Sequence, residues 1–188
     1  MEAFLVSVAT VALAEVGDKT QLLAFFLAAR LRKPVAILLG IFIATLTNHS
    51  LAGLLGVWIT TVLNPETLRW IIGLIFLAVA VWALVPDRLA EENALIGRYG
   101  AFVTSVVAFF LVEMGDKTQI ATAALAAHFG NLLAVVGGTT LGMMIADGPA
   151  VFLGEMASQR LPLRYVRYAA ALLFGVIGIL ILAGVGSG

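Results

Sequence analysis

The chain has 188 residues, of which 62% are hydrophobic and 12% are charged, and its mean hydropathy is +1.08. Soluble domains are only about 45–50% apolar, so the composition excludes an ordinary soluble domain and indicates an integral membrane protein in contact with the lipid bilayer. The absence of cysteine excludes disulfides and thiolate metal sites, and with eleven basic and eleven acidic residues in balance we expect no nucleic-acid partner.

Hydropathy along the chain predicts six membrane-spanning helices, and therefore an all-α integral membrane fold. Their expected ranges are about 3–29, 35–63, 68–85, 99–127, 132–157 and 166–185. The first, second, fourth and fifth exceed the roughly 20 residues that a straight helix needs to cross a bilayer. We therefore expect these four segments to be tilted or broken.

The first and fourth segments carry the same polar motif. Residues 15–21 read EVGDKTQ, and residues 113–119 read EMGDKTQ, with six of seven positions identical. A charge near the centre of a membrane helix costs about 2.5–3.5 kcal/mol on insertion scales, so the charges of these motifs must be compensated. We expect the two broken segments to be the two that carry the motif.

The spacing of 98 residues between the motifs extends along the whole chain. Matching residues include Ala3 and Ala101, Ser7 and Ser105, Gly40 and Gly138, and Phe76 and Phe174. The chain therefore reads as one three-helix unit used twice, with repeats at residues 1–90 and 99–188 and a cytoplasmic connection at 91–98. Because three is odd, the second copy must insert upside down, which predicts two inverted three-helix repeats.

Basic residues are concentrated in the loops that follow the first, third and fifth segments. These loops hold eight of them, and the opposite side has Arg69: the eight are Arg30, Arg32, Lys33, Arg88, Arg98, Arg160, Arg164 and Arg167. The positive-inside rule places these loops in the cytoplasm and both termini outside. At 1.5 Å per residue, Glu15 lies about 18 Å from Ala3 along a helix, so we expect the motifs near the membrane midplane.

The motifs offer four carboxylates, which predict a metal site. On a continuous helix the two acids of one motif are three residues apart and share a face. Oxygen ligands suit Ca²⁺, Mn²⁺ or Mg²⁺ better than Cu or Zn. The predicted metal ligands are Glu15, Asp18, Glu113 and Asp116, and the candidate secondary ligands are Thr20, Gln21, Thr118 and Gln119.

The motif lysines, Lys19 and Lys117, are expected to balance charge or to gate the site. Four carboxylates and two ammonium groups leave a charge of −2, which one divalent ion or two protons would neutralise. This charge balance predicts a cation/proton antiporter, although Na⁺ coupling fits nearly as well. The alternative is a pair of local structural bridges, Glu15 with Lys19 and Glu113 with Lys117, which would leave the excess negative charge without a partner.

Two further ionisable residues lie within predicted spans. Asp147 precedes Gly148 and Pro149, where we expect a kink, and its repeat counterpart is His49. Ionisable residues inside a membrane are functional by default, so both are candidates for a proton relay. A histidine near a helix end could instead reach the membrane interface. Gly138 is expected to pack helices within one molecule, and a homo-oligomer contact is the alternative.

The motifs EVGDKT and EMGDKT resemble the E-x-G-D-[KR]-[ST] pattern of a family of small six-helix transporters. That family includes Golgi, chloroplast and bacterial manganese or calcium transporters, and the resemblance covers the whole chain. It implies Mn²⁺ and Ca²⁺ transport in exchange for protons, with the four motif acids at the ion site. The metal ion would be the transported substrate, with no cofactor.

The expected function is Mn²⁺ export by cation/proton antiport, because the bacterial members that resemble this chain are linked to manganese export. The resemblance also favours a prokaryotic plasma membrane, because the chain lacks the long acidic central loop of many eukaryotic relatives; an organelle membrane is the alternative. A Ca²⁺-preferring exchanger and a passive divalent cation channel are the alternatives. An enzyme is not expected, because the sequence has no pairing of a nucleophile with a base and no cofactor motif.

Overall fold

The computed structural model describes residues 1–85, 100–153 and 163–184. These ranges contain no strand and fold into helices: α1 (Glu2–Glu15), α2 (Lys19–Leu31), α3 (Pro34–Val62), α4 (Pro65–Ala83), α5 (Gly100–Glu113), α6 (Lys117–Phe129), α7 (Leu132–Leu153) and α8 (Leu163–Leu182). The helices α3, α4 and α7 are long and apolar enough to cross a membrane, and α5 and most of α8 are shorter apolar helices. The all-helical prediction is confirmed, and the long apolar helices agree with a membrane protein.

The two segments that carry the motif are both broken, as expected. Helix α1 ends at Glu15 and α2 begins at Lys19, while α5 ends at Glu113 and α6 begins at Lys117. Gly17 and Gly115 lie between the helices with φ of +82° and +74°, in the left-handed region that glycine adopts most readily. Each motif therefore folds as a helix end, a glycine turn and a new helix N-terminus.

Two pairs of helices pack closely through small residues. A Cβ atom on Gly138 of α7 would lie 2.5 Å from the Phe4 carbonyl oxygen of α1, and one on Gly40 of α3 would lie 2.9 Å from the Phe102 carbonyl oxygen of α5. Only glycine allows the backbones to approach this closely. The expectation that Gly138 packs helices within one molecule is confirmed, and both residues of the second contact are the repeat counterparts of those in the first.

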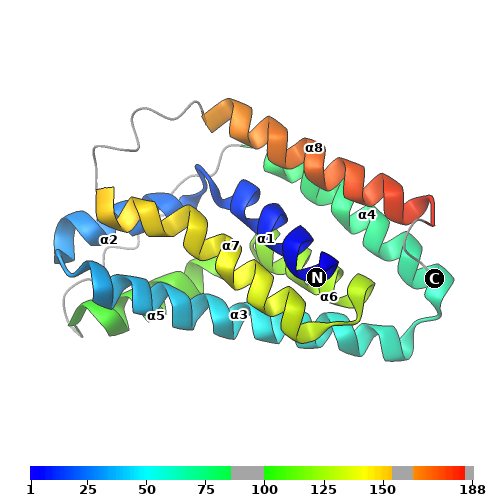
Figure 1. Cartoon of the computed structure of the whole chain (residues 1–188), viewed down its shortest axis with the longest axis horizontal. Coiled ribbons are helices and arrows are strands. Elements are labelled where there is room, and N and C mark those ends of the chain that lie inside the picture. The colour runs from blue at the N-terminus through cyan, green and yellow to red at the C-terminus, as the bar shows by residue number, and fades with distance from the viewer. Residues whose placement is uncertain (86–99, 154–162, 185–188) are drawn as a thin grey trace.

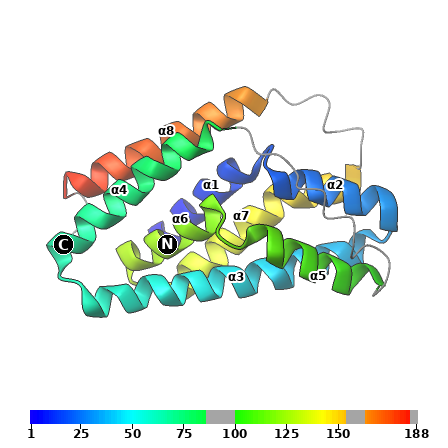
Figure 2. The same ribbon diagram turned by 180° about the vertical axis from the view of Figure 1, so that it is seen from behind.

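Helices α4 and α8 lie side by side along one flank of the molecule (Figures 1 and 2). The rings of Phe76 and Phe174 meet between them with centroids 6.0 Å apart, and both side chains are fully buried. These two residues are also repeat counterparts. Helices α4 and α8 therefore contact each other through equivalent positions of the two repeats.

The buried apolar side chains form two clusters, and the α4–α8 pair contributes to one of them. The first cluster joins α4 and α8 to α1, α6 and one residue of α7. The second cluster draws its described residues from α1, α2, α3, α5 and α7, with none from α4 or α8. The pair thus covers the α1 and α6 side of the bundle and leaves α2 and α5 without that cover.

Part of the predicted topology falls outside the described residues. This part includes the connection at 91–98 and three basic residues used for the orientation, Arg88, Arg98 and Arg160. The kink that we expect at Gly148 and Pro149 falls within α7. This helix continues through Pro149 to Leu153.

Candidate metal centre

Three buried carboxylates from the two motifs meet inside the bundle. One oxygen each of Glu15, Glu113 and Asp116 lies within 4.8 Å of the others, and all three residues are buried. The glutamates are the last residues of α1 and α5, and Asp116 precedes the first residue of α6. The two helix breaks therefore carry acids from distant parts of the chain to one place. We call these three residues the acid cluster.

The fourth predicted ligand, Asp18, lies outside the acid cluster. Its side chain accepts a hydrogen bond of 2.7 Å from the Lys19 backbone N–H and forms an ion pair with Lys117 of α6. The prediction that Glu15 and Asp18 share one helical face is wrong, because the helix stops between them. The same kind of break lies between Glu113 and Asp116, although the carboxylates of these two residues still meet in the acid cluster.

The two lysines reach across to the opposite motif. Lys19 Nζ lies 2.9 Å from Asp116 Oδ1, and Lys117 Nζ pairs with Asp18 Oδ2. The alternative of purely local bridges between the glutamate and lysine of one motif is therefore wrong. Each lysine instead neutralises an aspartate of the other motif, so both pairs tie the two breaks together.

The motif threonines contact the acid cluster directly. Thr20 Oγ1 donates a hydrogen bond to Glu15 Oε2. Thr118 Oγ1 lies 3.4 Å from Glu113 Oε2 and 3.4 Å from Asp116 Oδ2. Both hydroxyl side chains are fully buried, so they hold the carboxylates in place and add neutral oxygens to the centre.

The motif glutamines bridge the helix breaks. Gln21 Oε1 accepts a hydrogen bond of 2.9 Å from the Gly17 N–H, and Gln119 Oε1 accepts one of 2.7 Å from the Gly115 N–H. Both glycine N–H groups lie between two helices, where the helical hydrogen bonding is interrupted, and the glutamine side chains supply their acceptors. The glutamine oxygens that were predicted as secondary ligands thus serve the backbone in this structure.

Asn48 is a polar residue of this centre that the sequence reasoning did not assign. Its Nδ2 donates to the Phe110 carbonyl oxygen at 3.1 Å, and its Oδ1 accepts from Gln119 Nε2 at 3.5 Å. In the other half, Gln21 Nε2 donates to the carbonyl oxygen of Ala146, the repeat counterpart of Asn48, at 2.9 Å. The signal available in the sequence was an amide side chain next to His49 within a predicted span.

His49 and Asp147 both lie deep inside the bundle, with no exposed surface. His49 Nε2 is 3.9 Å from Glu113 Oε2, so the alternative that this histidine reaches the interface is wrong. Asp147 is close enough to Glu15 and Glu113 for their charges to interact. Neither carboxylate oxygen of Asp147 has a hydrogen-bond partner in the described part of the chain.

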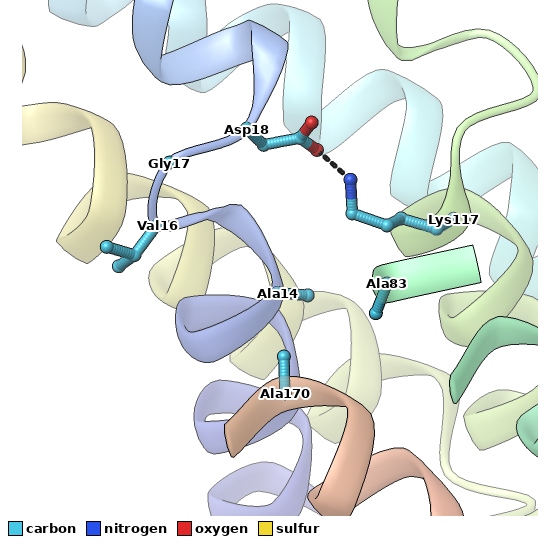
Figure 3. Close-up of a pocket in the computed structure, with 7 residues that line it drawn as sticks. All are labelled: Ala14, Val16, Gly17, Asp18, Ala83, Lys117 and Ala170. Atoms are coloured by element: carbon cyan, nitrogen blue, oxygen red, sulfur yellow. Dashed lines mark hydrogen bonds and ion pairs between the residues drawn. The ribbon is translucent and has the colours of Figure 1, made fainter. Parts of the chain in front are cut away.

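A small pocket lies beside the first break (Figure 3). It is lined by Ala14, Val16, Gly17, Asp18, Ala83, Lys117 and Ala170, with the Asp18–Lys117 ion pair at its edge. Its free volume suits about one water molecule. The pocket lies between the first motif and the α4–α8 pair, since Ala83 ends α4 and Ala170 belongs to α8.

Comparison with known proteins identifies the class of protein to which this centre belongs. The profile of a family described as "Divalent cation/proton antiporter GDT1" matches residues 3–91 and 101–187. The chain belongs to the GDT1 family. It is therefore a member of a transporter family, and its buried acids belong to a cation carrier rather than to an enzyme.

Relatives of this GDT1 family member come from bacteria, yeast and plants. A Vibrio cholerae protein named "Putative manganese exporter" is 48% identical over 175 residues, which cover 93% of this chain and 87% of that protein. The Saccharomyces cerevisiae protein named "Divalent cation/proton antiporter GDT1" is 24% identical over 234 residues, with 96% and 83% covered. "GDT1-like protein 3" of Arabidopsis thaliana is 40% identical over 73 residues, with 39% and 25% covered. No solved structure matches the chain.

Proposed function

We propose that this chain exports Mn²⁺ from the cytoplasm in exchange for protons, and that the acid cluster with Asp18 carries the ion. The observation that carries the proposal is the meeting of Glu15, Glu113 and Asp116 from both motifs within 4.8 Å. The 48% identical relative is named for manganese export, which supports Mn²⁺ as the ion. A Ca²⁺-preferring exchanger is the alternative for the same site.

Charge neutrality links the ion to protons. The motifs contribute four carboxylates and two lysines, which leaves a charge of −2 in a buried place. Buried charge is costly unless it is paired, so the site must bind a compensating charge at each stage of a cycle. One Mn²⁺ or two protons supply the same charge. Exchange between these two occupants is antiport.

We further propose that the chain consists of two inverted three-helix repeats, at residues 1–90 and 99–188, and six spans. The broken segments α1–α2 and α5–α6 would each count as one span. The reciprocal ion pairs and the Phe76–Phe174 contact support this symmetry, because each joins counterpart positions. The two ranges that match the family profile nearly coincide with the two repeats.

The position of the α4–α8 pair supports transport by alternating access. The pair covers Ala124 of α6, which is 3% exposed, while the repeat counterpart Phe26 of α2 is 38% exposed. Similarly, Leu13 of α1 packs against the first cluster, while its counterpart Leu111 of α5 is 45% exposed. If each repeat took the packing that the other has now, the α4–α8 pair would leave α1 and α6 and cover α2 and α5 instead. This would be a second conformation of the same chain.

The two packings would open the site to opposite sides of the membrane. We propose a prokaryotic plasma membrane, with both termini outside and the loops after the first, third and fifth spans in the cytoplasm. In that orientation α2 and α5 form the cytoplasmic half of the core, so the present packing is the one that faces the cytoplasm. A passive channel would need no such asymmetry, which makes it the weaker alternative.

The variant Glu113→Gln tests the site. It keeps the size of the side chain and removes one charge of the acid cluster, so we expect saturable Mn²⁺ binding to the purified protein to be lost while the fold is kept. The matched control is Glu66→Gln, which changes an exposed acid in the first turn of α4 and should bind Mn²⁺ normally. Unchanged Mn²⁺ affinity in Glu113→Gln would remove the acid cluster as the ion site.

A further inference from the structure

His49 is a buried imidazole outside the two motifs, and the proposed exchange of Mn²⁺ for protons gives it no role. It lies on α3, has no exposed surface, and neither ring nitrogen has a hydrogen-bond partner in the described residues. Leaving a buried polar group without a partner costs about 1–3 kcal/mol. A native structure keeps such a group when something else satisfies it.

The position of His49 indicates what satisfies it. Its Nε2 lies 3.9 Å from Glu113 Oε2, beside the acid cluster. Two atoms that each lie about 2.0–2.6 Å from one ion are about 3–4 Å apart at the angles found in metal sites. A single ion between the imidazole and the carboxylate would therefore accommodate this distance and give the nitrogen a partner.

We propose that His49 is a ligand of the transported ion and that its nitrogen selects Mn²⁺ against Ca²⁺ and Mg²⁺. This inference rests on the proposed function, because it takes the acid cluster as the ion site. Ca²⁺ and Mg²⁺ take oxygen ligands, whereas imidazole is a common ligand of first-row transition metals. The four motif acids alone offer only oxygen, so the histidine supplies the element that distinguishes these ions.

Only one of the two repeats supplies a histidine at this position. The counterpart of His49 is Asp147, which is also fully buried and lies within electrostatic reach of Glu15 and Glu113. A symmetric site would carry the same residue twice. This chain instead has one nitrogen and one further acid at matching positions.

The same chemistry predicts the order in which other metals compete. Affinity at nitrogen and oxygen sites rises from Mn²⁺ through Fe²⁺ and Co²⁺. Co²⁺ should therefore displace Mn²⁺ from the wild-type site, whereas Ca²⁺ and Mg²⁺ should compete weakly. Replacing His49 by an oxygen donor should bring Ca²⁺ closer to Mn²⁺ in affinity.

Pulsed electron paramagnetic resonance of bound Mn²⁺ tests the contact directly. The chain has two histidines, and the other, His128, lies eleven residues after Lys117 on α6, about 16 Å along the helix from the start of α6. In full-length protein with ¹⁵N-labelled histidine, bound Mn²⁺ should show a histidine nitrogen coupling. That coupling should persist in the control His128→Asn and vanish in His49→Asn.

Binding competition in the same variants tests the selectivity. We expect His49→Asn to lower the preference for Mn²⁺ over Ca²⁺ by about tenfold or more, with Ca²⁺ binding retained. Saturable Mn²⁺ binding without histidine coupling in wild type and His128→Asn would overturn this inference and leave the proposed function standing. Absence of saturable Mn²⁺ binding in the wild type would overturn both.

Discussion

Lys19 and Asp116 form an ion pair of 2.9 Å that joins the first motif to the second, and their repeat counterparts Lys117 and Asp18 form the reciprocal pair. Each aspartate immediately precedes the helix from which a lysine extends to the other motif. The two helix breaks are thus connected in both directions. These two reciprocal ion pairs hold the motifs together, and neither pair involves Glu15 or Glu113.

The two pairs differ in exposure, which predicts unequal costs when the lysines are removed. The Lys117 side chain is 4% exposed and that of Lys19 is 23% exposed. Removing one partner of a buried ion pair costs about 3–5 kcal/mol, because the other charge stays buried. Lys117→Met should therefore lower the unfolding free energy in detergent by about this amount, and Lys19→Met by clearly less. Equal losses would contradict the difference in burial.

Adjacent glycines on α7 should respond oppositely to alanine. A Cβ atom on Gly138 would lie 2.5 Å from the Phe4 carbonyl oxygen, whereas one on Gly137 would have its nearest neighbour at 3.8 Å. Gly138→Ala should therefore push α1 away from α7 and destabilise the protein, by about 1–3 kcal/mol for overpacking of a well-packed site. Gly137→Ala should be tolerated. Thermal unfolding of both variants in one detergent measures this, and a well-tolerated Gly138→Ala would refute the close contact of α1 and α7.

Cross-linking tests whether the α4–α8 pair must move. The chain has no cysteine, so Ala14→Cys and Ala170→Cys can be combined in a clean background. Both residues line the pocket between α1 and α8. A short bifunctional thiol reagent should bind the pair to α1 and stop transport, and cleavage of the reagent should restore it.

The matched control for this experiment joins α4 to α8 within the pair. A Cβ atom on Gly175 of α8 would have its nearest neighbour, the Cβ atom of Ala80 on α4, at 4.0 Å, so cysteines at these two positions fit without overpacking and can be linked. This second link should leave transport intact, because the pair moves as one unit. Full transport after linking Ala14→Cys to Ala170→Cys would show that the pair does not need to leave α1.

The motif, the repeat and the helix breaks were accessible from the sequence, because each depends on local chemistry or on spacing. The shared helical face of Glu15 and Asp18 was predicted wrongly. The sequence did contain the correcting signal: glycine followed by aspartate is typical of a turn and a helix N-terminus. The shared face holds only for a continuous helix, and the break that was expected in this segment removes it.

The relation of His49 to Glu113 could not be predicted from one sequence. It arises because α3 packs against α5, which brings together residues 64 positions apart. The partners of Lys19 and Lys117 were hidden for the same reason, since a local pairing within each motif is equally compatible with the spacing. Only the fold decides between a neighbour four residues away and one in the other repeat.

Proton-coupled Mn²⁺ transport through the acid cluster is tested most directly by Mn²⁺ flux into liposomes that contain the purified full chain. The flux is measured with and without an imposed pH gradient, beside Glu113→Gln and empty liposomes. For a Mn²⁺/proton antiporter, a proton gradient should drive Mn²⁺ in the opposite direction, Mn²⁺ movement should be accompanied by a pH change inside the liposomes, and Glu113→Gln should behave like empty liposomes. Mn²⁺ flux that is indifferent to the pH gradient and unaffected by Glu113→Gln would contradict both proton coupling and the acid cluster as the ion site.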